Sequence, residues 1–406
     1  MEMSNKKNAT LYYGIIMATY SVGFVTMSAF SSVYLLDIGL SNGAVGILIA
    51  IASMVSVLLQ PFVGALIDRY RFVSSKRALL CLAIMIAIIG AIIVFVTFDS
   101  IVVTSLLYGI DIMMLMLAQP FLNSLGMDAI NYGYPINFGL GRSLGSMGYA
   151  LGSYAFGHIS VIAGPRSVPI AFTIAFLVLC VWIVIYPVKT EAKDSDSFID
   201  IFAKENEKKT GLAKEPHFLL KYKRFTVMLL GMIMVYFSHS LINTFSLQIV
   251  TTKGGNSSSM GTAAAIAAFC ELITMILFPL YLKRFRLNSM LRVACIFFTL
   301  KIALSIVVPN VALFYAIQVV QMFGWGIMSI GIVYYVNELV GNYDKAQGQA
   351  YAGMSFTIAS VIATFTGGNM IDWWGVSTML VVGTVMAIVG TIIVWISVED
   401  VEVVAR

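Results

Sequence analysis

Long apolar runs recur along the chain and are separated by short polar segments. A helix of about 20 apolar residues crosses roughly 30 Å of hydrocarbon, and in lipid each peptide group must find its hydrogen bond within such a segment. The pattern therefore predicts an all-α membrane protein with twelve transmembrane helices, whose two termini lie on the same side. The helices are expected at residues 11–36, 44–67, 78–98, 101–127, 138–163, 168–188, 225–250, 259–282, 290–308, 311–336, 346–370 and 376–398.

The composition excludes a water-soluble fold. Hydrophobic residues make up 59% of the 406 residues and charged residues only 11%, whereas a soluble domain has about 25% charged residues. A soluble fold could not cover that much apolar surface.

Basic residues are concentrated in alternate loops. One side of the predicted membrane carries only Arg166 and Lys253, and the positive-inside rule makes the opposite, crowded side cytoplasmic. Both termini are then cytoplasmic, in an inner membrane, and the net charge of +5 reflects topology and not nucleic-acid binding. The crowded side carries Lys6, Lys7, Arg69, Arg71, Lys76, Arg77, the basic residues of 189–224, Lys283, Arg284, Arg286, Arg292, Lys345 and Arg406.

A single long polar stretch, residues 189–224, divides the predicted helices six and six. We expect two bundles, 1–188 and 225–406, joined by a cytoplasmic linker. A weak repeat supports this division, because Arg69, Arg71 and Arg77 match three later arginines at one sequence offset. The alternative is that these arginines match only because the positive-inside rule places basic residues in every cytoplasmic loop. Paired bundles around a midplane site are the usual architecture of secondary transporters.

Charged residues inside the apolar runs are informative, because each costs about 2.5–3.5 kcal/mol near a helix centre. They should face a partner or a wet cavity. Glu271 and Lys301 have opposite signs in neighbouring predicted helices, so we expect an ion pair between them, with a substrate role or a purely structural one. The candidate proton-coupling groups are Asp111, Asp128, Glu271 and His239. Asp111 could instead hydrogen-bond between helices, and His239 could be a packing residue.

The segment 138–163 combines small residues with an arginine and an aromatic ring. Tyr149 follows Arg142 by seven residues, so both lie on about the same side of a helix. A ring that stacks and a guanidinium that donates hydrogen bonds suit a sugar. Snorkelling of Arg142 at a helix end and anchoring of Tyr149 at the lipid interface are the alternatives. Close helix packing is expected at Gly141, Gly145, Gly148 and Gly152.

Two motifs resemble the major facilitator superfamily. The segment QPFVGALIDR, residues 60–69, is similar to the superfamily's loop motif, which implies a gating role for Gly64, Asp68 and Arg69. The segment FGLGRSLGSMGYAL, residues 138–151, resembles the fifth helix of the oligosaccharide:proton symporters. That resemblance implies two pseudo-symmetric six-helix bundles and sugar-binding roles at Arg142, Ser146 and Tyr149. In the C-terminal half, Glu271 resembles the family's helix-eight glutamate that bonds sugar hydroxyls, and Lys301 stands where the family has an arginine.

The chain departs from these symporters at the proton relay. Gln318, Gln321 and Gly324 stand where that family has Lys, His and Glu, and Asn123 with Ser124 stands in place of a helix-four Glu. Coupling through another group and simple facilitation therefore both remain open. Asn123 and Gln321 join the candidate substrate-binding residues.

The function expected from the sequence is transport of a mono- or oligosaccharide by alternating access. The alternatives are a nucleoside:proton symporter, a multidrug exporter and a non-transporting membrane sensor. An enzyme is not expected, because the chain has three histidines and no nucleophile motif. The expected partners are a small-molecule substrate and the bilayer, with no nucleic acid, metal or cofactor beyond an optional proton gradient, and the protein is expected to be a monomer.

Overall fold

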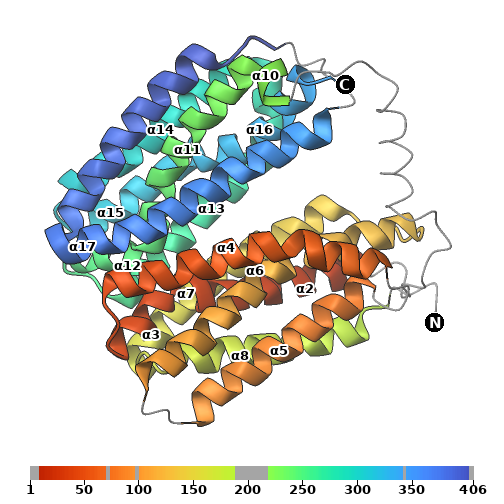
Figure 1. Cartoon of the computed structure of the whole chain (residues 1–406), viewed down its shortest axis with the longest axis vertical. Helices are drawn as coiled ribbons and strands as arrows, with labels where there is room; N and C mark the ends of the chain where they lie inside the picture. Colours follow the sequence, from red (N-terminus) through yellow and green to blue (C-terminus); the bar gives the residue numbers. More distant parts are fainter. Residues whose placement is uncertain (1–8, 70–73, 97–99, 188–217, 342–343, 402–406) are drawn as a thin grey trace. The chain divides into compact units, whose positions relative to one another are not determined.

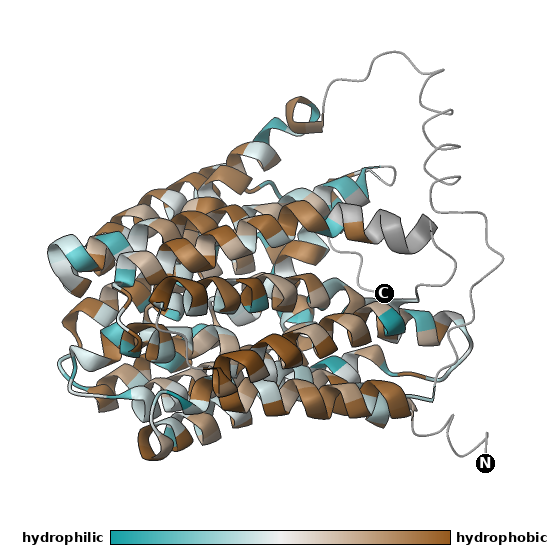
Figure 2. Ribbon diagram, turned by 60° about the horizontal axis from the view of Figure 1, so that its bottom comes forward, coloured by the Kyte–Doolittle hydropathy of each residue, from teal (hydrophilic) through white to brown (hydrophobic). Residues whose placement is uncertain are grey.

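The computed structural model describes residues 9–69, 74–96, 100–187, 218–341 and 344–401. All regular structure in these ranges is helical, and ten of the helices are long and apolar enough to cross a membrane. Figure 2 shows apolar residues running along most of their length. The protein is therefore a multi-pass membrane protein, as the hydrophobic pattern predicts.

The helices follow the predicted spans closely. The first part of the chain contains α2 (Ala9–Phe24), the π-helix η1 (Val25–Ala29), α3 (Ser31–Asp37), α4 (Asn42–Arg69), α5 (Ser75–Phe95), α6 (Ile101–Asn131), α7 (Phe138–Ala163) and α8 (Ser167–Ile185). The later part contains α10 (Phe218–Lys221), α11 (Lys223–Thr244), α12 (Ser246–Thr251), α13 (Ser257–Arg284), α14 (Leu287–Val307), α15 (Val311–Gln318), the 3₁₀-helix η2 (Val319–Met322), α16 (Trp325–Leu339) and α17 (Lys345–Ser397).

The helix count is consistent with twelve spans. Helix α17 contains the last two predicted spans, which Figure 1 shows as two arms that meet at one end. They meet at Gly375, whose φ of 83° is readily adopted only by glycine. Helix α7 matches the fifth predicted span, although it is not one of the ten helices that are long and apolar enough to cross a membrane.

Two predicted spans change their winding in the middle. The first passes from α2 through the π-helix η1 to α3, and the tenth passes from α15 through η2 to α16. Local π and 3₁₀ segments within a helix are frequent at functional sites. The even hydrophobic pattern of the sequence gives no sign of either change.

The described chain forms two compact units. The described residues of unit 1 fall within 1–28, 51–149 and 166–216, and those of unit 2 fall within 29–50, 150–165 and 217–406. Unit 2 thus includes the start of α4 and the end of α7 as well as the helices after the polar stretch. The division at 189–224 into two bundles remains a prediction.

Tyrosine hydroxyls join the helices of unit 1. Tyr20 of α2 donates to the backbone oxygen of Leu115 at 2.7 Å, and Tyr108 of α6 donates to that of Met27 at 2.7 Å. At the end predicted to be cytoplasmic, Lys76 donates to the carbonyl oxygen of Tyr186 at 2.7 Å. These bonds place polar groups in a bundle whose core is otherwise mainly apolar.

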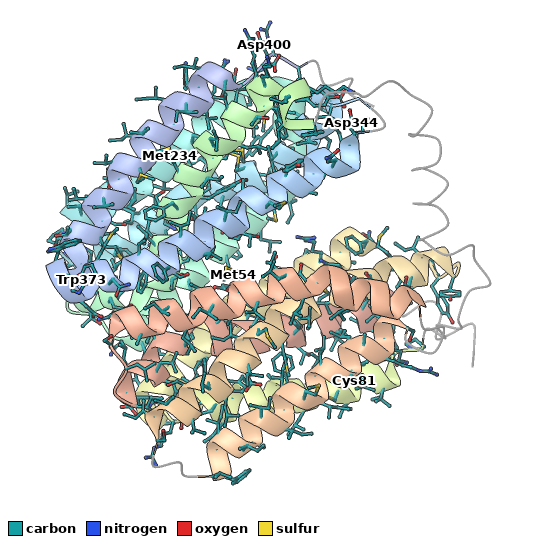
Figure 3. All side chains as sticks on the ribbon, viewed as in Figure 1. Met54, Cys81, Met234, Asp344, Trp373 and Asp400 are labelled. Carbon is teal, nitrogen blue, oxygen red and sulfur yellow. The ribbon has the colours of Figure 1, made fainter. Side chains whose placement is uncertain are left out.

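Helices α11 and α17 lie in close contact in unit 2, where a Cβ atom on Gly390 would come within 2.6 Å of the Gly231 carbonyl oxygen. At the predicted cytoplasmic end, Lys221 pairs with Asp344 at 2.9 Å. Figure 3 shows Trp373 at the opposite end of this unit from Asp344 and Asp400. The last two spans therefore run out and back across the unit, as the predicted threading requires.

Candidate functional site

A buried polar chain crosses the interior of unit 2. The Nζ atom of Lys301 in α14 donates to Oε1 of Gln321 in η2 at 2.6 Å, and the Nε2 atom of Gln321 donates to Oε1 of Glu271 in α13 at 2.6 Å. Lys301 and Gln321 are each 3% exposed, and Glu271 is partly exposed. Three separate helical elements thus supply one continuous hydrogen-bonded chain.

The expected direct ion pair between Glu271 and Lys301 is wrong. The Gln321 amide lies between the two charges, with its oxygen toward the ammonium and its nitrogen toward the carboxylate. Each bond has one ionised partner, which makes it stronger than a bond between neutral groups. A glutamine can bridge two opposite charges in this way because it offers a donor and an acceptor at one end.

The chain has unused hydrogen-bonding capacity. An ammonium has three N–H donors and a carboxylate has about four acceptor positions, and the bonds to Gln321 use one of each. Glu271 is also the most exposed member of the chain. A solute with several hydroxyl groups could therefore donate to the carboxylate and accept from the ammonium.

An aromatic cluster surrounds His239 beside this chain. The His239 ring stacks on Trp325 with a centroid distance of 4.7 Å and an interplanar angle of 9°, and Phe298 meets it edge-on at 5.2 Å. Trp325 follows Gln321 by four residues, and Phe298 precedes Lys301 by three. The cluster and the polar chain therefore share α14, and Trp325 begins α16, the helix that follows the η2 segment carrying Gln321. Tyr236 and Phe356 complete the cluster around Trp325.

The hydrogen bonding of His239 indicates its tautomer. Its Nε2 atom lies 2.9 Å from the Asn243 Nδ2 atom, an amide nitrogen that can only donate. With Nε2 as the acceptor, the proton of a neutral ring is on Nδ1. That atom is buried and has no hydrogen-bond partner among the described residues. His239 thus presents a free N–H donor within the aromatic cluster.

The candidate residues of α7 lie in unit 1. Arg142 is exposed, Ser146 and Tyr149 are half-buried, and the Tyr149 ring lies 6.4 Å from that of Phe24. The glycines on this helix allow close packing against α2. A Cβ atom on Gly148, for example, would lie 2.6 Å from the Ala18 carbonyl oxygen.

Helix α6 carries a buried carboxyl group in unit 1. Asp111 is 0% exposed, and neither of its oxygen atoms has a hydrogen-bond partner in the part of the chain that the structure describes. The Asn123 side-chain oxygen is likewise buried without a partner there, whereas Asp128 is half-buried. An ionised carboxylate in such surroundings would be very costly.

The structure thus brings together only some of the predicted site residues. Glu271, Lys301 and Gln321 form one chain, with His239 nearby, whereas the other candidates lie in unit 1. The expected gating residues Gly64, Asp68 and Arg69 belong to α4, and their side chains lie outside the described residues. No group of three or more potential metal ligands occurs among the described residues.

Sequence reasoning missed the aromatic cluster. Trp325, Phe298 and Phe356 look like ordinary apolar residues of three different spans. One available signal was the spacing of Trp325 from Gln321, which is one helical turn. The bridging role of Gln321 had no signal in the sequence, because it depends on how three helical elements meet.

A buried ionic chain within membrane-spanning helices is typical of transporters. The chain belongs to the MFS_1-like family, whose model matches residues 13–382. No curated protein matches it significantly in sequence.

Solved transporters share the fold. The nucleoside transporter NupG has a TM-score of 0.76 at 14% identity, and the match covers 96% of this chain and 98% of that one. A D-xylose-proton symporter has a TM-score of 0.68 at 14% identity, with 98% of each chain covered. The peptide transporter POT in complex with sulfate has a TM-score of 0.71 at 11% identity, with 95% of this chain and 93% of that one covered.

Proposed function

We propose that this secondary transporter carries a sugar, either a mono- or an oligosaccharide, across the cytoplasmic membrane. The Lys301–Gln321–Glu271 chain is the observation that carries the proposal. Three polar groups inside apolar helices are costly, and such groups in transporters usually mark a substrate or ion pathway. Their unused donors and acceptors match the hydroxyl groups of a sugar.

The adjoining aromatic cluster supplies the second element of sugar recognition. A pyranose ring has an apolar C–H face that packs on an aromatic side chain, and Trp325 is only partly buried. The Nδ1–H of His239 is buried without a partner among the described residues, and it would become a directional donor to a solute that enters the cluster. Arg142, Ser146, Tyr149 and Asn123 remain candidate sugar contacts on the strength of the sequence resemblance.

A nucleoside is the second candidate substrate. A nucleobase is flat on both faces and stacks on Trp or His more completely than a sugar does, and its ribose offers hydroxyl groups to Glu271. The fold shared with the nucleoside transporter NupG agrees with this alternative. A nucleoside also fits better than the substrates of a multidrug exporter. The buried charges beside the aromatic cluster suit a polar solute.

The site can be tested by counterflow of labelled sugars and nucleosides into proteoliposomes. Glu271→Gln keeps the side-chain shape but removes the charge, and bonds to charged groups contribute about 1.5–3 kcal/mol. We expect exchange to fall by roughly tenfold or more. Glu338→Gln makes the same change at an exposed position of α16 and should leave exchange intact. Equal exchange by the two variants would remove Glu271 from the site.

We propose further that transport is coupled to protons through Asp111. Helix α6 packs against α2, α5 and α8. No cationic side chain occurs in α2 or α8, and the only ones in α5 are Lys76 and Arg77 in its first turn. The other titratable groups of these helices are Tyr12, Tyr13, Tyr20, Cys81 and Cys180. With no cation along the described length of these helices to balance it, burial favours the neutral, protonated form of this carboxyl. A carboxyl that is protonated when buried can release that proton when water reaches it.

Asp111→Asn mimics the protonated group permanently. The variant should exchange solute at the wild-type rate but should fail to accumulate it when a pH gradient is imposed. Asp37→Asn, at an exposed position, is the matched control. Accumulation by Asp111→Asn equal to that of the control would exclude Asp111 as the coupling group, and a wild-type protein that never accumulates solute would indicate a facilitator.

A further inference from the structure

An aspartate of α17, Asp372, caps the first turn of α4. The Asp372 carboxylate accepts hydrogen bonds from the backbone nitrogen of Asn42 at 3.2 Å and from that of Gly43 at 2.6 Å. It also accepts one from the Asn42 side-chain nitrogen at 2.8 Å. All of these residues belong to unit 2, although 330 positions separate Asn42 from Asp372.

The cap satisfies amides that α4 cannot satisfy itself. The first N–H groups of a helix have no partner within the helix, and they form the positive end of its dipole. Ser41 supplies the local N-cap, accepting from the Ala44 nitrogen at 3.2 Å. The backbone N–H groups of Asn42 and Gly43 donate to the Asp372 carboxylate instead. A negatively charged acceptor is favoured at this end of a helix. The Nε2 atom of Gln248 donates to the side-chain Oδ1 atom of Asn42 at 2.8 Å.

Close backbone contact continues along both helices from this cap. A Cβ atom on Gly368 would lie 2.1 Å from the Asn42 carbonyl oxygen, and one on Gly46 would lie 2.1 Å from that of Thr364. Thr364, Gly368 and Asp372 are spaced by four residues, so they form one stripe of α17 against the first two turns of α4. We call this contact the α4–α17 seam.

We propose that Asp372 is a latch that holds the α4–α17 seam closed and is released when this end of the transporter opens. The two helices come from opposite predicted bundles, and alternating access moves such bundles against each other. The latch therefore rests on the proposed transport cycle. Asp372 is exposed while it caps the helix, whereas Gly43 is buried. Water can therefore replace the bonds to the carboxylate when the helices separate, which makes the contact reversible.

Opening of the seam can be measured by alkylation of a cysteine within it. Thr364→Cys is conservative, because the Thr364 hydroxyl bonds only to carbonyls of its own helix and the residue is buried. The probe is a membrane-impermeant maleimide applied to proteoliposomes, and the modified peptide is quantified by mass spectrometry, so the native cysteines can stay. The alkylation rate then reports how often the seam opens.

Asp372→Asn in the Thr364→Cys background removes the charge and one acceptor. We expect the alkylation rate to rise by roughly tenfold or more, the factor that corresponds to about 1.4 kcal/mol. The matched control is Asp37→Asn, which removes the same charge from an exposed position close to α4 in sequence. A rate for Asp372→Asn equal to that of the control would overturn the latch.

A second variant keeps the test valid if Asp372→Asn folds poorly. Gly368→Ala forces a methyl group against the Asn42 carbonyl and should also accelerate alkylation, whereas Gly353→Ala, where nothing lies within 4 Å of the new atom, should not. An unchanged rate for Gly368→Ala would show that the seam is not the barrier and would overturn the proposal. Alkylation needs no solute, so this result is independent of whether sugars or nucleosides are exchanged.

Discussion

Replacing Gln321 with leucine tests the bridge directly. The substitution keeps the size of the side chain but removes the acceptor of Lys301 and the donor to Glu271. Bonds to charged groups contribute about 1.5–3 kcal/mol each, and a buried charge deprived of its partner costs about 3–5 kcal/mol. Glu271 is partly exposed and can be hydrated when its partner is lost, whereas Lys301 is buried and cannot. We therefore expect the free energy of unfolding to fall by about 3 kcal/mol.

The assay is reversible denaturation in detergent micelles, with a double-mutant cycle. Lys301→Met combined with Gln321→Leu should be more stable than Gln321→Leu alone, because no unpaired ammonium then remains in the interior. Gln318→Leu is the matched control, since Gln318 is equally buried but bonds only to the Phe314 carbonyl of its own helix. Additive losses in the cycle, or a loss for Gln321→Leu no larger than for the control, would refute the bridge.

Three further substitutions test packing and capping, each measured as a shift in the thermal unfolding midpoint. Gly261→Ala would place a methyl group 2.2 Å from the Ser153 carbonyl oxygen and should destabilise the protein by about 1–3 kcal/mol; an unshifted midpoint would contradict the close contact. Tyr20→Phe removes the 2.7 Å bond to Leu115 and should cost about 1 kcal/mol. Asn256→Ala removes the side chain that accepts from the Ser258 and Ser259 amides at the start of α13, again at about 1 kcal/mol; for both, a gain in stability would be the contrary result.

The hydrophobic pattern was sufficient to predict the helices, because in lipid the backbone has few alternatives to a helix. The start of α7 at Phe138 and the start of α15 at Val311 match the predicted spans. The pattern could not show where a span changes from α-helix to π-helix or 3₁₀-helix. The π segment η1 (VTMSA) and the 3₁₀ segment η2 (VVQM) mix apolar and polar residues as the adjoining helices do, so their sequences do not mark a change of pitch.

The candidate site was only partly predictable. Glu271 and Lys301 stood out because a charge in an apolar run demands a partner. Their actual partner, Gln321, carries no charge, so the energetic cost of burying a charge gave no reason to place it between them. The same holds for Asp372, which lies between the predicted spans 346–370 and 376–398, where a charge needs no buried partner. Contacts between segments hundreds of positions apart depend on tertiary packing, which one sequence does not encode locally.

The distance in sequence between α4 and its cap has a consequence for biogenesis. Translation proceeds from the N-terminus, so α4 enters the bilayer long before Asp372 leaves the ribosome. Until then the Asn42 and Gly43 amides lack the carboxylate that accepts from them in the folded protein, and water is the acceptor at hand. The hairpin of α17 thus completes a helix that was inserted much earlier.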